Sequence, residues 1–125
     1  MYYKTELREN YKLNDYRIIL YDQDDNELGF VSGDDHTAAT NSYFKLEMLL
    51  VKDKEMRRKG RMGVGSLLLQ KFEALALAMG ATYIKGTFSL HEYYNSTEDW
   101  EQALTKFYKK HGYSIDRHSI SKKIS

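Results

Sequence analysis

The chain has 125 residues, with 19 Lys and Arg against 18 Asp and Glu, and it contains no cysteine. This length fits one domain over residues 1–125, and a net charge of +1 leaves nucleic-acid binding to local patches only. The absence of cysteine excludes disulfides, thiolate catalysis and cysteine-ligated metals. No apolar run is long enough for a membrane span, and the N-terminus lacks an apolar signal segment, so we expect a cytoplasmic protein without a membrane partner.

Alternating apolar and polar residues dominate the first half of the chain and predict antiparallel strands. Residues 2–13 mix aromatic and charged residues and favour a strand over a short helix. A polar turn at 22–26 joins two alternating segments as a hairpin, and a polar loop at 34–41 precedes a longer strand. The predicted strands are 2–13, 16–21, 27–32 and 42–51.

The second half predicts two helices and three further strands. The first helix, 63–79, ends at Gly80, and its apolar residues recur at helical spacing. The second helix begins at the N-cap residues near Ser96 and ends before Gly112. The apolar face of the first helix comprises Val64, Leu67, Leu68, Phe72, Leu75 and Ala76. The predicted strands are 81–88, 113–116 and 118–124.

A basic run at 52–61 and two glycines, Gly63 and Gly65, join the long strand to the first helix. Six of the ten residues in the run are Lys or Arg. The first turn of a helix leaves amide N–H groups without intrahelical acceptors and carries partial positive charge, and glycine lets an anion approach them closely. A charge run alone is more often a solvated loop, but next to these glycines it favours a polyanionic ligand.

Two nucleotide motifs are excluded by the spacing of these glycines. A P-loop requires a lysine before Ser66, where the chain has Gly65. A dinucleotide fold requires Gly-x-Gly-x-x-Gly and an acidic residue after the next strand, whereas this chain has Gly60-x-x-Gly63-x-Gly65 and no such carboxylate.

The junction resembles the acyl-CoA loop of the GNAT acetyltransferase superfamily, Arg/Gln-x-x-Gly-x-Gly/Ala between a strand ending in valine and a long amphipathic helix. Val51, Gly63, Gly65 and the helix start match it. Gly60 stands where the family has Arg or Gln, and Arg57 or Arg58 could supply that cation after a shift of the loop.

A second segment, 103–113, resembles a late motif of the same family. It carries Phe107-Tyr108 on a helix, then polar residues, then Gly112 and the aromatic Tyr113, which opens the next strand. It follows the glycine loop after about the interval that the family requires, with one helix and one strand between. The two segments together make the resemblance stronger than either alone.

The resemblance implies an α+β fold with a mixed, mostly antiparallel sheet, in which strands 42–51 and 81–88 form a parallel pair splayed around the CoA site. Residues 1–40 leave little room for the two N-terminal helices of the family, so we expect these to be reduced or absent. Because those helices often shape the acceptor pocket, the substrate class stays open, and the site is either more open or completed by a partner subunit. An exposed edge strand leaves a homodimer open as well.

The resemblance also implies acetyl-CoA as co-substrate and assigns its contacts. Backbone groups of Leu49, Leu50 and Val51 would hold the pantetheine amides, and side-chain cations would attract the phosphates. The amides that would hold the pyrophosphate belong to Met62, Gly63, Val64, Gly65 and Ser66. The cations are Arg57, Arg58, Lys59 and Arg61. The four histidines lie at no metal-ligand spacing, so we expect no metal.

Two residues are candidates for the chemistry of acetyl transfer. Tyr108, which the resemblance places near the CoA sulfur, would donate a proton to the leaving thiolate; its alternative is a tyrosine packed between elements. Glu47 is the candidate base, directly or through water. By strand alternation it shares a face with Lys45, Leu49 and Val51, and its alternative is a salt bridge with a neighbouring lysine.

Three functional readings follow. The first is an N-acetyltransferase acting on an amine of a small molecule or a protein. The second, its alternative, is a catalytically inactive GNAT-fold module that binds CoA or a protein. The third is a nucleic-acid-binding protein using the basic loop. That loop lacks an aromatic for base stacking and is interrupted by Asp53 and Glu55, so nucleic acid ranks behind CoA.

Overall fold

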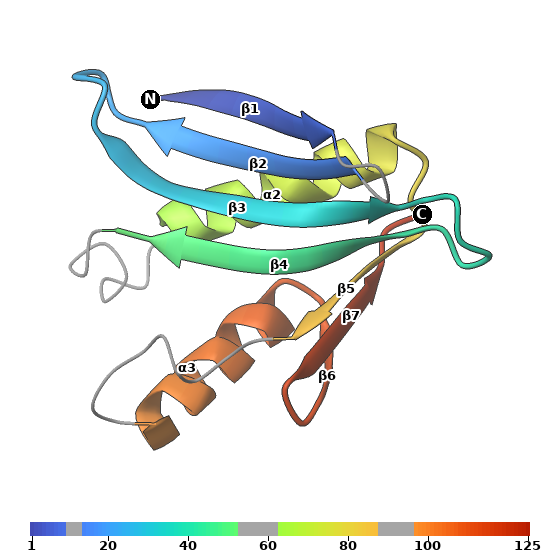
Figure 1. Cartoon of the computed structure of the whole chain (residues 1–125). Coiled ribbons are helices and arrows are strands. Elements are labelled where there is room, and N and C mark those ends of the chain that lie inside the picture. The colour runs from blue at the N-terminus through green and yellow to red at the C-terminus, as the bar shows by residue number, and fades with distance from the viewer. Residues whose placement is uncertain (10–13, 53–62, 88–96) are drawn as a thin grey trace.

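The computed structural model in Figure 1 describes residues 1–9, 14–52, 63–87 and 97–125, with side chains of the last range from residue 102 onward. In this part of the chain, seven strands form one sheet in the order β1-β2-β3-β4-β5-β7-β6. Neighbouring strands are antiparallel except β4 and β5, which run parallel as predicted. The strands are β1 (Tyr2–Glu9), β2 (Asn14–Tyr21), β3 (Glu27–His36), β4 (Tyr43–Val51), β5 (Tyr83–Thr87), β6 (Ser114–Asp116) and β7 (Ser119–Lys123). The helices are α2 (Val64–Ala78) and α3 (Thr97–Lys110).

The N-terminal strands form a continuous meander. β1 pairs with β2 along its whole length, out to Glu9 opposite Asn14, which leaves four residues between the two strands. That connection is too short for a helical pair, so the prediction of reduced or absent N-terminal helices is confirmed. The β2–β3 turn is held by Asp22, whose carboxylate accepts the N–H groups of Asp24 and Asn26 at 2.8 and 2.9 Å.

The structure corrects the predicted polar loop at 34–41, because β3 continues to His36. Asp34 pairs with Lys45 and Asp35 pairs with Phe44 in the β3–β4 ladder. Polar residues read as a loop in sequence, but an antiparallel strand accepts them where one face is open to water. The correction moves Asp34 from a connection into the sheet.

Helix α2 covers one face of the sheet, and the main core lies between them (Figure 1). Close packing requires Gly33 on β3, because a Cβ atom there would lie 2.4 Å from both the Phe72 ring and the Lys45 carbonyl oxygen. The fully buried side chains include Ile18, Leu20, Val31, Phe44, Leu68, Leu69, Phe72 and Ile84. In the described part of the chain, no helix covers the opposite face of β1–β4.

A β-bulge in β4 overturns one sequence-based assignment. Ser32 lies opposite Met48 and Gly33 lies opposite Leu46, so Glu47 is the extra residue of β4. Beyond the bulge, Leu49 and Val51 pack against the core on the α2 side, as Leu46 does before it. The expectation that Glu47 shares a face with Leu49 and Val51 is therefore wrong, because the extra residue shifts the alternation by one.

Both helices end at glycines with positive φ, as predicted. Gly80 (φ 94°) follows α2, and Gly112 (φ 87°) follows α3. After α3, the Tyr113 N–H donates to the Tyr108 carbonyl at 3.0 Å, which is the long bond of a Schellman motif. This motif holds the backbone from the end of α3 to β6 in one conformation.

Candidate functional site

The parallel strands β4 and β5 are paired for only part of the length of β4. Their register runs from Tyr43 opposite Tyr83 to Leu46 opposite Gly86. From Glu47 onward β4 still pairs with β3 but no longer with β5, and Figure 1 shows β5 diverging from it. The separation begins at the bulge, since a bulge bends its strand and increases the local twist. The segment assigned to the pantetheine arm, Leu49–Val51, lies beyond this point.

The start of α2 offers backbone donors to an anion. Gly63 is its N-cap in extended conformation, with no side-chain cap, and the first turn contains no acidic residue. The Leu67 N–H donates to the Gly63 carbonyl at 3.2 Å, so the amides from Gly63 to Ser66 precede the intrahelical ladder. Within Gly63 and the first turn of α2, neither a capping side chain nor a carboxylate neutralises the positive end of the helix dipole. These amides include those assigned above to the pyrophosphate, and that assignment stays a prediction.

Three elements meet at Gly65. A Cβ atom at this position would lie 3.5 Å from Cγ2 of Val51 and 3.5 Å from the Phe107 ring. The end of β4, the first turn of α2 and the last turns of α3 therefore converge there. Val51 and Gly65 were predicted as cofactor residues, whereas Phe107 was named only as part of the late motif, because the sequence carries no signal for which side of α3 faces α2.

The side-chain cations assigned to the phosphates lie outside the described residues. This applies to Arg57, Arg58, Lys59 and Arg61, and to Met62 and the departure at Gly60. Of the basic run, only Lys52 is described; its ammonium forms an ion pair with Glu27.

Tyr108 lies inside an aromatic cluster at the C-terminal end of α3. Its side chain is 4% exposed, and its ring packs edge-on against Phe107 and Tyr113, at centroid distances of 5.2 and 5.6 Å. The cluster adjoins the junction at Gly65 through Phe107. The role of Tyr108 as acid stays a prediction.

Glu47 lies beside a second carboxyl group that sequence analysis did not name. Its carboxylate is 3.4 Å from the Lys45 ammonium, and it forms a hydrogen bond with Asp34. Burial, then this hydrogen bond and the charge of Glu47, raise the pKa of Asp34 to about 6. A hydrogen bond between two carboxyls requires a proton on one of them, and the raised pKa places that proton on Asp34 below that pH.

The carboxyl pair lies where β4 leaves β5. Asp34 pairs with Lys45 in the ladder, while Gly33, which precedes Asp34, and Leu46, which follows Lys45, face α2. Alternation therefore points Asp34 and Lys45 to the uncovered face of the sheet. The signal that could have identified Asp34 is the alternation of β3 continuing past Gly33.

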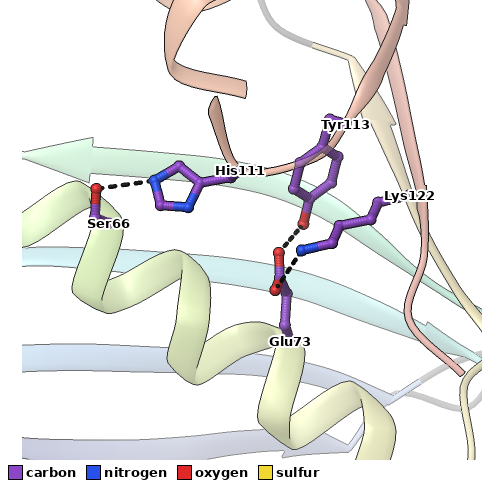
Figure 2. Close-up of polar contacts among 5 residues, drawn as sticks. All are labelled: Ser66, Glu73, His111, Tyr113 and Lys122. Atoms are coloured by element: carbon purple, nitrogen blue, oxygen red, sulfur yellow. Dashed lines mark hydrogen bonds and ion pairs between the residues drawn. The ribbon is translucent and has the colours of Figure 1, made fainter. Parts of the chain in front are cut away.

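A polar cluster joins α2 to the C-terminal segment (Figure 2). Ser66 and His111 are connected by a hydrogen bond of 2.9 Å between Oγ and Nε2. About two turns further along α2, Glu73 accepts hydrogen bonds from the Tyr113 hydroxyl at 2.7 Å and from the Lys122 ammonium at 3.0 Å. These contacts bury Ser66, which the predicted apolar face of α2 omitted.

The described residues show neither a candidate metal cluster nor a candidate membrane span. No group of three or more His, Cys, Asp or Glu side chains in this part of the chain could hold a metal ion. None of its helices is long and apolar enough to cross a membrane.

Solved structures share this fold at low sequence identity. An aminoglycoside 6'-N-acetyltransferase complexed with coenzyme A is 21% identical, with a TM-score of 0.63 over 89% of this chain and 73% of that one. An acetyltransferase from Bacillus cereus is 20% identical, with a TM-score of 0.63 over 89% and 74%. The aminoglycoside 6'-N-acetyltransferase from Enterococcus faecium is 19% identical, with a TM-score of 0.59 over 89% and 73%.

A search among curated proteins finds no match to the sequence. A family model, the acetyltransferase (GNAT) domain, matches residues 14–115. The match spans the strands that splay, the glycine junction and the end of α3. The chain therefore belongs to the GNAT acetyltransferase family, whose members depend on acetyl-CoA.

Proposed function

We propose that this protein is an N-acetyltransferase, which moves the acetyl group of acetyl-CoA directly to a primary amine of a small molecule or a protein. The observation that supports it most is the end of the β4–β5 ladder at Leu46 and Gly86. Beyond that point lie the strand assigned to the pantetheine arm and the uncapped start of α2, and beside it lies the carboxyl pair.

The cofactor would bind mainly through backbone groups. The amides at Gly63 to Ser66 would hold the pyrophosphate, and Leu49 to Val51 would pair with the pantetheine arm as an added strand does. Acetyl-CoA supplies the activated thioester, and the protein supplies its orientation. The cations of the basic run would add attraction that weakens with salt.

The carboxyl pair would receive the acceptor amine. An alkylamine arrives as an ammonium ion at neutral pH and must lose a proton before it attacks the thioester carbonyl. Glu47 and Asp34 offer negative charge to the ammonium and an acceptor for its proton, on a face of the sheet that no described helix covers. Because the pKa of Asp34 is raised to about 6, Asp34 is mostly ionised only above that pH.

The carboxyl pair suits an acceptor with more than one positive charge. Two of the similar structures are named as enzymes that acetylate aminoglycosides, although their identity of about one fifth supports only the shared fold. We propose a polycationic small molecule as the first acceptor class to screen. A cytoplasmic location and a homodimer through an edge strand, β1 or β6, also remain proposals.

Tyr108 would return a proton to the departing CoA thiolate. Its burial also favours the second candidate, a GNAT-fold module that binds CoA without turnover, since a packed tyrosine has a structural role. Tyr108→Phe separates the two because it removes the hydroxyl and keeps the ring. An enzyme loses turnover at unchanged CoA affinity, whereas a binding module has no turnover to lose.

The first experiment is calorimetric titration with acetyl-CoA, with desulfo-CoA and ATP as controls, followed by a screen of amines for release of free CoA thiol. Binding of both CoA compounds but not ATP, with turnover of an amine, supports the proposal. Glu47→Gln should then reduce kcat/KM at least about a hundredfold, within the usual range for loss of a general base. Asp116→Asn, which removes an exposed carboxylate on β6, is the matched control. Absence of CoA binding by the intact protein would refute the assignment.

A further inference from the structure

The contact between Ser66 and His111 joins the anion-binding turn of α2 to the end of α3. Ser66 is 5% exposed and is the last residue of that first turn before the intrahelical ladder begins. Its hydroxyl lies 2.9 Å from Nε2 of His111. Figure 2 shows the imidazole reaching from the end of α3 to Ser66, separately from the cluster around Glu73.

Both the backbone and the ring of His111 are held in place by neighbouring residues. The backbone N–H of His111 donates to the carbonyls of Phe107 and Tyr108 at 3.3 and 3.1 Å. The Schellman motif at Gly112 ends the helix directly after His111. Its ring also packs on Phe107 at a centroid distance of 4.9 Å, and Phe107 in turn adjoins Gly65. The imidazole is therefore held against the turn whose amides would take the pyrophosphate.

We propose that His111 is a positioning residue of the cofactor site, which holds the first turn of α2 through Ser66 and, when protonated, adds a positive charge that strengthens binding of the CoA pyrophosphate. The proposal rests on the proposed function, since it assumes that CoA binds at this turn. It assigns no catalytic step to His111, and the burial of Ser66 leaves its hydroxyl unsuited to act as a nucleophile.

The charges around His111 determine its protonation. Burial lowers its pKa below the usual value, the carboxylate of Glu73 on α2 acts in the opposite direction, and Lys110 on α3 and Lys122 on β7 lower it further. Glu73 is already shared between Tyr113 and Lys122, and its effect on the His111 pKa is smaller than that of burial. The imidazole is thus neutral in the free protein at neutral pH.

Binding of an anion beside the imidazole must favour its protonated form. By linkage, cofactor binding then takes up a proton, and affinity rises as pH falls through the pKa of the complex, levelling off below the pKa of the free protein. Neutral His111 accepts or donates one hydrogen bond at Nε2, depending on the tautomer, whereas protonated His111 donates there. In both states the link to Ser66 can persist.

The test measures calorimetric affinity for dephospho-CoA, whose pyrophosphate does not change charge between about pH 6 and pH 8. We expect the wild type to bind about fivefold more tightly at the lower pH, the effect of one added, partly screened charge. Titrations in buffers with different ionisation enthalpies should show proton uptake on binding.

Three variants separate position from charge. His111→Gln keeps a donor and acceptor for Ser66 without the charge, and should retain the affinity measured at about pH 8 while losing the pH dependence. His111→Ala should lose both. Ser66→Ala removes the link but keeps the imidazole, and should weaken binding at both pH values while the pH dependence persists.

The outcomes separate this inference from the proposed function. If the wild type binds no CoA compound, the proposed function fails first. If the wild type binds and His111→Gln shows the same pH dependence as the wild type, the charge assigned to His111 is refuted. If His111→Ala, folded by circular dichroism, binds as tightly as the wild type at about pH 8, the positioning role is refuted.

Discussion

Replacement of Gly65 tests the anion-binding turn most directly. Gly65 lies in the first turn of α2, and a Cβ atom there would be 3.5 Å from Val51 and from Phe107, which is ordinary van der Waals contact. An added carbon atom therefore fits without moving the neighbours. A carboxylate in the first turn also complements the helix dipole, so Gly65→Glu should fold.

The expected effect of Gly65→Glu on cofactor binding comes from charge. One negative charge at roughly 5 Å from one charge of the pyrophosphate costs about 3 kcal/mol at an effective dielectric of about 20, which is about a hundredfold in Kd. Gly65→Gln has nearly the same size without the charge, and should lose much less affinity. Gly65→Ala should raise the free energy of unfolding by about 0.4–1 kcal/mol, because it restricts the unfolded chain at a helical position.

The assay is calorimetric titration of the three variants and the wild type with acetyl-CoA, combined with urea unfolding. If Gly65→Glu is folded and binds acetyl-CoA within about threefold of the wild type, the pyrophosphate does not lie at this turn. A loss that is equal in Gly65→Gln and Gly65→Glu would show that size, and not charge, excludes the ligand.

Three further predictions concern the surrounding structure. Tyr113→Phe should lower the free energy of unfolding by about 1.5–2 kcal/mol. This is the low end for a hydrogen bond to a charged group, because Lys122 still pairs with Glu73 in the variant. A loss below about 0.5 kcal/mol in urea unfolding would contradict this prediction. The stability of the wild type should fall as pH rises from about 4 to about 6, because the folded protein, with the pKa of Asp34 at about 6 rather than 3.8, binds this proton more tightly than the unfolded chain does. Asp34→Asn should remove this fall. Thermal unfolding of both proteins across that range measures it, and a stability difference between them that does not change with pH would contradict the prediction. Gly33→Ala should destabilise the protein by about 2–3 kcal/mol because its Cβ meets the Lys45 backbone and Phe72 at 2.4 Å. Gly80→Ala, with φ of 94° and no atom within 4 Å, should cost only about 1–2 kcal/mol of strain, and equal losses would argue against close packing at Gly33.

Asp34→Asn should also affect acetyl transfer, and there we expect a loss. The same change that removes the loss of stability between about pH 4 and pH 6 also removes half of the carboxyl pair proposed to receive the amine. We expect Asp34→Asn to lower the rate of amine acetylation while its stability no longer falls over that pH range, which is the trade-off expected of a residue kept for function.

The elements and the glycine junction were predictable because their signals are local. Alternation over a few residues marks β2, β3 and β4, and helical periodicity marks α2. Gly80 and Gly112 end the helices where predicted because a positive φ is a property of one residue. The late motif at Tyr108 and Gly112 is likewise contained in one helix and its cap.

What the sequence alone determined is thus the order of elements, the glycine-to-helix junction and the family resemblance, each of which rests on neighbours along the chain. Only the tertiary structure decided which side chains meet. The bulge that separates Glu47 from the face of Leu49 depends on the β3–β4 register, and the Asp34–Glu47 pair exists because that register brings the two strands together. The contacts of Ser66 with His111 and of Glu73 with Tyr113 join residues that are 45 and 40 positions apart. Periodicity shows which residues are buried but not which distant partner they contact, because that choice depends on how whole elements pack.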